Sequence, residues 1–250
     1  MTEALALHDI SFSIGGVHLT QDVSLQLNKG DRMALMGPNG AGKTTLMNLV
    51  AGSRVPTSGR ILLDGSDITT WSPQRRARKG LARTFQITNL LSTRTVEENL
   101  ALAVGSGHPR RAHPFRSWRS MKDTWSRVDE LVERSGLGDI RRRPVASLPY
   151  AEQRKLEIVV AVARPAKVVM LDEPGAGLTR DEAGALIELV FDLGEDVAVL
   201  FVDHDMQLVR RLATRMVLLE LGQIVAEGSP ADVEASDAFD RIYMRSSRRA

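Results

Sequence analysis

The sequence predicts an α/β fold in which a parallel sheet carries a phosphate-binding loop. The loop, residues 37–44, reads GPNGAGKT and fits the pattern G-x-x-x-x-G-K-[ST]. An apolar run at 32–36 precedes it and a helical pattern at 45–51 follows it, which is the context the pattern requires. Two further unbroken apolar runs, 168–172 and 197–202, are typical of parallel strands covered on both faces.

The loop is suited to the phosphates of a nucleoside triphosphate. Its glycines let the backbone curl so that N–H groups point at an anion, and the helix N-terminus adds a partial positive charge. Lys43 is expected to reach the β- and γ-phosphates, and the Thr44 hydroxyl to ligate Mg²⁺. The predicted nucleotide-binding residues are Gly37, Pro38, Asn39, Gly40, Ala41, Gly42, Lys43, Thr44 and Thr45.

The composition is that of a globular protein with one elaborated domain or two subdomains. Of the 250 residues, 43% are hydrophobic and 26% are charged, and the net charge is only +2. Acids and bases are interspersed, so the charge does not favour nucleic acid as a partner. The chain has no cysteine, which excludes disulfides and thiolate chemistry. Without a secretory signal or a long apolar run, we expect a cytoplasmic protein that reaches a membrane only through a partner.

The first strands are expected to form a small antiparallel sheet around the strand–loop–helix unit. Residues 5–12 and 23–27 alternate between apolar and polar side chains, and Gly15 and Gly16 form a turn between them. A further strand at 60–64 ends at the turn signal Asp64-Gly65.

Residues from about 88 to 165 have helical patterns. A capping box at 95–98 opens one helix, and further helices are expected at 121–135 and 152–164, the last ended by Pro165. Between them, residues 105–119 form an exposed loop with two open interpretations: a solvated loop, or a contact with lipid headgroups or a membrane partner. Its arginines are Arg110, Arg111, Arg116 and Arg119.

Beyond residue 165 the α/β pattern returns. A capping box at 179–182 opens the helix between the two apolar runs. A hairpin is expected at 216–220 and 223–227, followed by a helix that starts at Ser229-Pro230.

Polar residues at strand ends supply the candidate catalytic groups. Asp172, at the end of its strand, is expected to hold Mg²⁺ directly or through water. Glu173 is expected to face the γ-phosphate and polarise the attacking water. Two acids ending a strand are common on protein surfaces, but together with the loop they indicate catalysis. His204 follows another parallel strand and is expected to touch the γ-phosphate, and the Gln86 amide to sense Mg²⁺ and the water.

In this combination and order, the motifs resemble those of ABC-type ATPase cassettes over nearly the whole chain. The segments are the loop, Phe85-Gln86, residues 147–153, Leu171-Asp172-Glu173-Pro174 and Val202-Asp203-His204-Asp205. Within that family, residues 80–86, 148–158 and 204–209 resemble the ATP-binding subunits of branched-chain amino acid and amide/urea importers.

The resemblance implies a single ABC ATPase domain, 1–250. Its P-loop NTPase (RecA-like) core with an antiparallel β subdomain would comprise 1–85 and 166–250, and a helical signature subdomain would comprise 86–165. The cofactors implied are ATP and Mg²⁺. Two cassettes would pack head to tail around two ATP molecules and drive permease subunits, in a system with an extracytoplasmic solute-binding protein. The chain would then lie on the inner face of the cell membrane.

Two other functions stay open. The chain could be a soluble ABC ATPase that serves DNA repair or translation, although it has one cassette and lacks a coiled-coil insert. It could also be a regulatory module that binds ATP with little turnover. The residues Gln86, Glu173 and His204 favour hydrolysis over the second.

The chain departs from the family in its signature, usually Leu-Ser-Gly-Gly-Gln. The five positions that would face the partner's ATP are here Leu148, Pro149, Tyr150, Ala151 and Glu152. Pro149 offers neither a hydroxyl nor an N–H, and Ala151 replaces a glycine that lets the backbone approach phosphate. We therefore predict a weak signature half-site and a functional heterodimer with a second cassette.

Two more positions differ from the family pattern. Where the family stacks an aromatic residue on adenine, this chain has Ile14, with Phe12 two positions before. Where the family often has an Asp that crosses to the other cassette, it has Thr179. We therefore expect a modest nucleotide affinity, and no carboxylate at this position to reach the other cassette.

Overall fold

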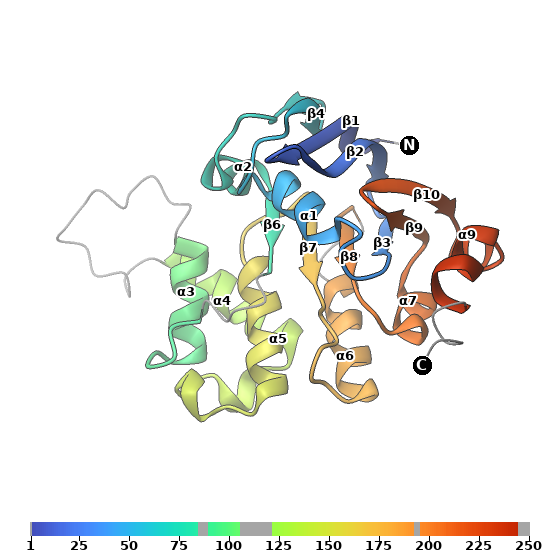
Figure 1. The fold of residues 1–250 in the computed structure, drawn as a ribbon. Helices are drawn as coiled ribbons and strands as arrows, with labels where there is room; N and C mark the ends of the chain where they lie inside the picture. The colour runs from blue at the N-terminus through green and yellow to red at the C-terminus, as the bar shows by residue number, and fades with distance from the viewer. Residues whose placement is uncertain (1, 85–89, 106–121, 193–195, 245–250) are drawn as a thin grey trace. The chain divides into compact units, whose positions relative to one another are not determined.

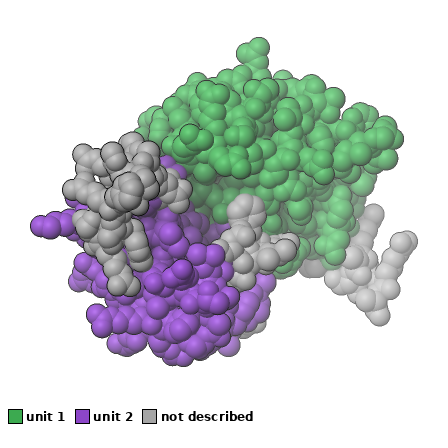
Figure 2. All heavy atoms as spheres, turned by 90° about the vertical axis from the view of Figure 1, so that its left-hand side faces the viewer, with its two compact units in different colours: residues 1–83, 167–175, 195–250 green, residues 84–166, 176–194 purple. Residues whose placement is uncertain are grey.

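The computed structural model describes most of the 250-residue chain, and its described parts form two compact units (Figures 1 and 2). The described residues are 2–84, 90–105, 122–192 and 196–244. The first unit comprises residues 1–83, 167–175 and 195–250, and the second comprises 84–166 and 176–194.

The second unit extends beyond the expected helical subdomain, 86–165. It also contains residues 176–194, which include the helix α6 (Arg180–Asp192). Leu189 on α6 is buried in the apolar cluster of the second unit. The expected core, 1–85 and 166–250, included this helix. Its apolar contacts, which the chain order does not reveal, place it with the other helices.

The first unit contains a four-stranded antiparallel sheet in the order β2-β1-β4-β5. Its strands are β1 (Glu3–Ile14), β2 (Val17–Asn28), β4 (Ser58–Leu63) and β5 (Ser66–Asp67). Gly15 and Gly16 form the predicted turn, both with positive φ. The expected antiparallel sheet is confirmed, and β1 and β2 are longer than their apolar alternation indicated.

A six-stranded sheet in the order β10-β9-β3-β8-β7-β6 forms the other layer of this unit. All neighbouring strands are parallel except β10, which pairs antiparallel with β9 at one edge. The closing hairpin is thus part of the sheet that carries the loop. The strands are β3 (Arg32–Met36), β6 (Leu81–Arg83), β7 (Val168–Asp172), β8 (Ala198–Val202), β9 (Arg215–Glu220) and β10 (Gln223–Gly228).

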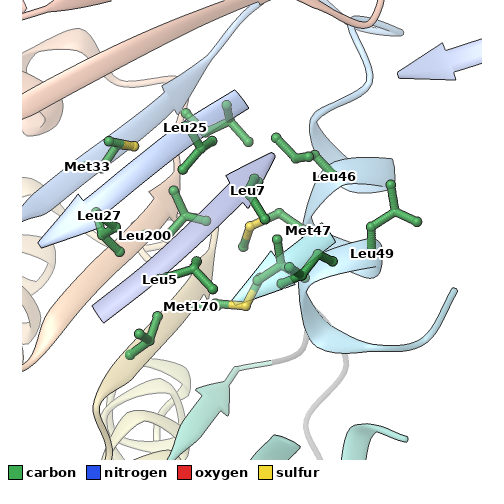
Figure 3. Close-up of a cluster of buried hydrophobic side chains, with 14 of the residues drawn as sticks. Leu5, Leu7, Leu25, Leu27, Met33, Leu46, Met47, Leu49, Met170 and Leu200 are labelled. Carbon is green, nitrogen blue, oxygen red and sulfur yellow. The ribbon is translucent and has the colours of Figure 1, made fainter. Parts of the chain in front are cut away.

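The helix α1 (Lys43–Ala51) shares one apolar cluster with strands of both sheets. In Figure 3, Met47 on α1 lies beside Leu7 on β1, and Met170 and Leu200 come from the six-stranded sheet. Gly52 ends the helix in a left-handed conformation. Because β3 and α1 are both fixed in this core, the loop between them has two rigid ends.

Short helices complete the first unit. They are α2 (Pro73–Lys79), α7 (Met206–Leu212), α8 (Pro230–Glu234) and α9 (Asp237–Phe239), and a π-helical turn follows at Asp240–Met244. Ser229 and Asp232 form a capping box at the predicted start of α8. The helices α8 and α9 pack against the β9–β10 hairpin (Figure 1).

The described part of the second unit is helical around its own apolar cluster. Its long helices are α3 (Val96–Gly105), α4 (Lys122–Ser135), α5 (Tyr150–Ala161) and α6. The predicted capping boxes are present at Thr95–Glu98 and at Thr179–Glu182. The helix α5 starts two residues before the predicted position and ends three residues earlier than predicted. No helix in the described ranges has the length and apolar character needed to cross a membrane.

Candidate active site

The phosphate-binding loop connects β3 to the start of α1, as the motif requires. Its glycines Gly37, Gly40 and Gly42 have φ values of 145°, 81° and 102°, a backbone region that side chains disfavour. A Cβ on Gly37 would lie 2.2 Å from the carbonyl oxygen of Leu219, and one on Gly42 would lie 2.6 Å from that of Leu19. The curl of the loop therefore depends on glycine both for its conformation and for its close packing on β9 and β2.

Lys43 is folded back onto the loop. Its Nζ donates to the carbonyl oxygens of Gly37 at 2.6 Å and Pro38 at 3.0 Å. Burial lowers the pKa of Lys43, while the nearby carboxylates of Glu173 and Asp172 act in the opposite direction. The ammonium group therefore lies where the loop and the acidic pair meet.

The first turn of α1 leaves polar groups free to meet a ligand. Gly42 provides no side-chain cap, and this turn contains no acidic residue. Thr44 is exposed and Thr45 is half-buried. The amide groups and hydroxyls at this helix end therefore form a site that favours an anion.

Asp172 lies at the end of β7 and is buried. Nη2 of Arg83 lies 3.4 Å from its Oδ2, and Nη1 of the same arginine donates to Oδ1 of Asn48 on α1 at 2.7 Å. Arg83 thus connects the acid to the helix that follows the loop. Arg83 lies in a motif that was recognised in the sequence, but no role was predicted for it, because its acidic partner is 89 positions away.

Glu173 and His204 are brought together by neighbouring strands. Asp172 on β7 is paired with Val202 on β8, so the residues that follow both strands meet at one sheet edge. Nε2 of His204 lies 2.9 Å from Oε1 of Glu173. Glu173 has a φ of 48°, and its N–H donates to the carbonyl oxygen of Val202 at 2.8 Å. A non-glycine residue in this conformation is strained, a state often found at functional sites.

Asp203 organises this sheet edge from a buried position. Its Oδ1 accepts hydrogen bonds from the N–H groups of His204 at 2.7 Å and Asp205 at 2.9 Å. Its Oδ2 accepts one from Gly175, two residues beyond Glu173, at 3.3 Å. No role was predicted for Asp203 from the sequence, although an acid directly after a parallel strand was a signal for one.

The structure describes Ile14, the residue predicted to lie against the base, but not Gln86. Ile14 ends β1 and is 51% exposed, whereas Phe12 packs against the buried core. Of the two, Ile14 has the more exposed apolar side chain. Gln86 lies outside the described residues, as do the arginines of the loop 105–119.

The predicted signature residues are in the second unit, around the start of α5. Leu148 is buried, Pro149 is the N-cap, and the next three residues form the first turn. Tyr150 is half-exposed, and a Cβ added to Gly177 would lie 2.9 Å from its ring. Oε2 of Glu152 is buried with no hydrogen-bond partner in the described chain. Proline at the N-cap leaves this helix start without a side-chain hydrogen-bond acceptor.

The family model for the ABC transporter matches residues 20–176 of this chain. The chain belongs to the ABC transporter family. It is an ATP-binding subunit of an ABC transporter and an ATPase of that family. The matched residues contain the loop, the signature and the acidic pair.

Relatives of this ABC transporter ATPase align with it over nearly the whole length of both chains. The high-affinity branched-chain amino acid transport ATP-binding protein LivG of Salmonella typhimurium is 34% identical and covers 96% of this chain and 97% of its own. The corresponding LivG of Escherichia coli is 33% identical over the same shares. BraF of Pseudomonas aeruginosa, with the same description, is 31% identical over 96% and 97%.

Solved structures confirm the fold of this ABC transporter ATPase. A nucleotide-free ATP-binding cassette from an ABC transporter has a TM-score of 0.85 at 26% identity, over 96% of this chain and 98% of its own. A cassette solved in an ADP conformation has a TM-score of 0.83 at 26% identity, over 98% and 99%. The predicted P-loop core with an antiparallel sheet and a helical part is thereby confirmed.

Proposed function

We propose that this ATPase energises an importer of branched-chain amino acids. The support is that the named relatives carry this description and match nearly the whole chain. Specificity for the solute would reside in permease subunits and an extracytoplasmic solute-binding protein. The permease subunits would hold the chain at the inner face of the cell membrane.

In this proposal, residues 37–44 bind the terminal phosphates of ATP. The glycine conformations and the uncapped start of α1 support it, because both direct amide groups at an anion. Nζ of Lys43 now donates to two loop carbonyls, and a phosphate oxygen is a stronger acceptor than a carbonyl. Ile14 provides an apolar surface for the base, without the stacking that an aromatic ring offers.

Glu173 is the general base that activates water, and His204 holds it in place. The 2.9 Å contact between the two side chains supports this assignment. The left-handed backbone at Glu173 costs about 1–2 kcal/mol, and the hydrogen bond to Val202 helps to maintain it. His204 is 53% exposed on its side chain and is therefore open to the γ-phosphate.

The oxygen donors near the loop fit Mg²⁺. Thr44 is exposed at the start of α1, and the carboxylate of Asp172 ends β7; both are hard ligands of the type this ion prefers. We propose that these two residues, together with Gln86, hold it. Mg²⁺, when bound, would neutralise charge on the phosphates.

A second cassette would complete the ATP site with its own signature. The signature of this chain, residues 148–152, would face the ATP of the partner. Pro149 at the N-cap and the acidic Glu152 in the first turn support the proposal of a weak half-site. A heterodimer with a second cassette follows from that asymmetry.

Substitution of the proposed base tests the catalytic assignment. Glu173→Gln should retain MgATP binding but reduce turnover by about 10²–10⁴-fold, the usual contribution of a general base. The matched control is Glu133→Gln, on an exposed position of α4, which should leave turnover unchanged. Turnover near the wild-type rate in Glu173→Gln would exclude this residue as the base.

Uptake in cells tests the solute. A strain without this gene should lose uptake of radiolabelled leucine, and the wild-type gene should restore it while the Glu173→Gln gene should not. Normal leucine uptake combined with lost urea or amide uptake would overturn the proposed solute class.

A further inference from the structure

The C-terminal segment of the first unit ends against the phosphate loop. Tyr243 lies in the π-helical turn Asp240–Met244. Its phenolic oxygen accepts a hydrogen bond from the backbone N–H of Gly37 at 3.0 Å. The two residues are 206 positions apart, so the far end of the chain contacts the first residue of the loop directly.

Gly37 has little freedom to find another partner for this N–H. The residue is buried, and its Cα faces the backbone of β9, where a Cβ would meet the carbonyl oxygen of Leu219. On the carbonyl side of the same residue, the oxygen accepts from Nζ of Lys43. The first residue of the loop is thus held by β9, by Lys43 and by Tyr243.

Tyr243 is itself held in place by its neighbours. The rings of Phe239 and Tyr243 have centroids 4.7 Å apart. Between these residues, Arg241 forms an ion pair with Glu220 at the end of β9, at 2.6 Å. Burial raises the pKa of Tyr243, and the hydrogen bond from Gly37 opposes that rise. The hydroxyl therefore meets Gly37 as a neutral phenol at physiological pH.

We propose that Tyr243 is a positioning residue for ATP binding, because its oxygen fixes the N–H of Gly37 and with it the curl of the loop. The inference rests on the proposed role of residues 37–44 in holding the phosphates. A loop that is ordered before ATP arrives loses less conformational entropy on binding, so the contact acts on affinity. It does not touch the reacting atoms, so it leaves the rate of the bound state unchanged.

The test removes one atom. In the full-length chain, Tyr243→Phe retains the ring and deletes the acceptor oxygen. The dissociation constant for MgATP should rise roughly three- to tenfold, as expected for one lost neutral hydrogen bond. The value of kcat at saturating MgATP should stay within about twofold. The control Arg241→Gln breaks the exposed ion pair of the same turn but keeps the tyrosine oxygen. It should raise the dissociation constant by less than about twofold, because surface pairs contribute little.

Amide hydrogen exchange at Gly37 gives a second readout. In the wild-type chain this amide should be protected, and Tyr243→Phe should remove the protection while Arg241→Gln retains it. Unprotected exchange in the wild-type chain would overturn the inference even if Tyr243→Phe failed to fold. A loss of thermal stability in Tyr243→Phe without a change in MgATP affinity would overturn it too.

A further variant separates this inference from the proposed function. Lys43→Ala should abolish MgATP binding if the loop holds the phosphates. If Lys43→Ala eliminates binding and Tyr243→Phe does not weaken it, only the inference on Tyr243 fails. If Lys43→Ala binds MgATP normally, the proposed role of the loop fails, and the inference fails with it.

Discussion

At the scale of single residues, the buried arginine Arg76 is held by backbone carbonyl groups of two preceding segments. Arg76 is fully buried, and its guanidinium donates to the carbonyl oxygens of Leu49 and Val50, both at 2.6 Å, and to those of Thr69 and Trp71. Leu49 and Val50 belong to the last turn of α1, whose dipole favours a cation there. Burial lowers the pKa of Arg76 to about 10, so the side chain is still charged at pH 7. An arginine from α2 therefore caps the C-terminal end of α1, the helix that follows the phosphate loop.

Replacement of this arginine should destabilise the protein. Arg76→Met removes the guanidinium donor from the carbonyl groups of Leu49 and Val50, although Leu49 retains the N–H of Gly52. We expect the free energy of unfolding to fall by about 2–4 kcal/mol. Urea unfolding measures it. The neighbouring Arg75, which stacks on the ring of Trp71 at 3.7 Å, is the control, and Arg75→Met should cost only about 0.5–1 kcal/mol. Equal losses in the two variants would refute the role of the buried hydrogen bonds.

At the scale of elements, the edge where β7 and β8 end explains how the catalytic candidates are grouped. Apolar runs in the sequence predicted both strands, and the residues after them predicted Asp172, Glu173 and His204. Their mutual contacts required the strand pairing, which the sequence does not show. The short elements β6, α2 and α7 were not predicted, because segments of three to seven residues carry little periodicity and are set by tertiary contacts. The contacts of Arg83 with Asp172 and of Tyr243 with Gly37 could not be predicted either, because they join residues that only the tertiary structure brings together.

Asp203 is expected to affect the rate of ATP turnover, because it fixes the backbone around His204 and Gly175 at this sheet edge. Asp203→Ala removes the acceptor for the N–H groups that fix His204 and Gly175, so turnover should fall by about 10–100-fold, the effect of a lost charge-assisted hydrogen bond. The affinity for MgATP should change by less than about threefold, because the loop is untouched. The control Asp205→Ala removes the N-cap of α7, which accepts from Gln207 and Leu208, and should affect stability more than turnover. Similar turnover in Asp203→Ala and wild type would contradict this assignment.

At the scale of the whole molecule, ion pairs connect segments that are distant in the chain. Asp64, in the turn between β4 and β5, pairs with Lys167 just before β7, 103 positions away. The hydrogen bond from Lys167, and then its charge, lower the pKa of Asp64 below 3.8. The pair thus joins the antiparallel sheet to the strand that leads to the acidic residues.

The stability contributed by this pair should depend on pH. Since the folded pKa of Asp64 is lowered, its contribution is present above the unfolded pKa and is lost as pH falls through the folded value. Asp64→Asn should lower the free energy of unfolding at pH 7 by up to about 1 kcal/mol. The difference from wild type should shrink as pH falls below the unfolded pKa of Asp64 and should disappear once pH is below the lowered folded pKa. Urea unfolding at a series of pH values measures it, and a difference that persists in acid would contradict the role of the charge.

The altered signature, residues 148–152, should also affect ATP turnover when this chain pairs with a second copy of itself. If Pro149 and Ala151 weaken the half-site, the lone chain should turn over ATP slowly. Pro149→Ser combined with Ala151→Gly should then raise its turnover about tenfold or more, by restoring charge-assisted hydrogen bonds to phosphate. Vigorous turnover by the unmodified lone chain would argue against the heterodimer.

The proposed mechanism of hydrolysis depends most on where the phosphates of ATP lie. The direct measurement is a crystal structure of the Glu173→Gln chain with MgATP, in which hydrolysis is stalled. We predict that the terminal phosphates lie within residues 37–44 against Lys43, with the side chain of residue 173 facing the γ-phosphate. ATP bound elsewhere, or residue 173 turned away from the phosphate, would contradict the account.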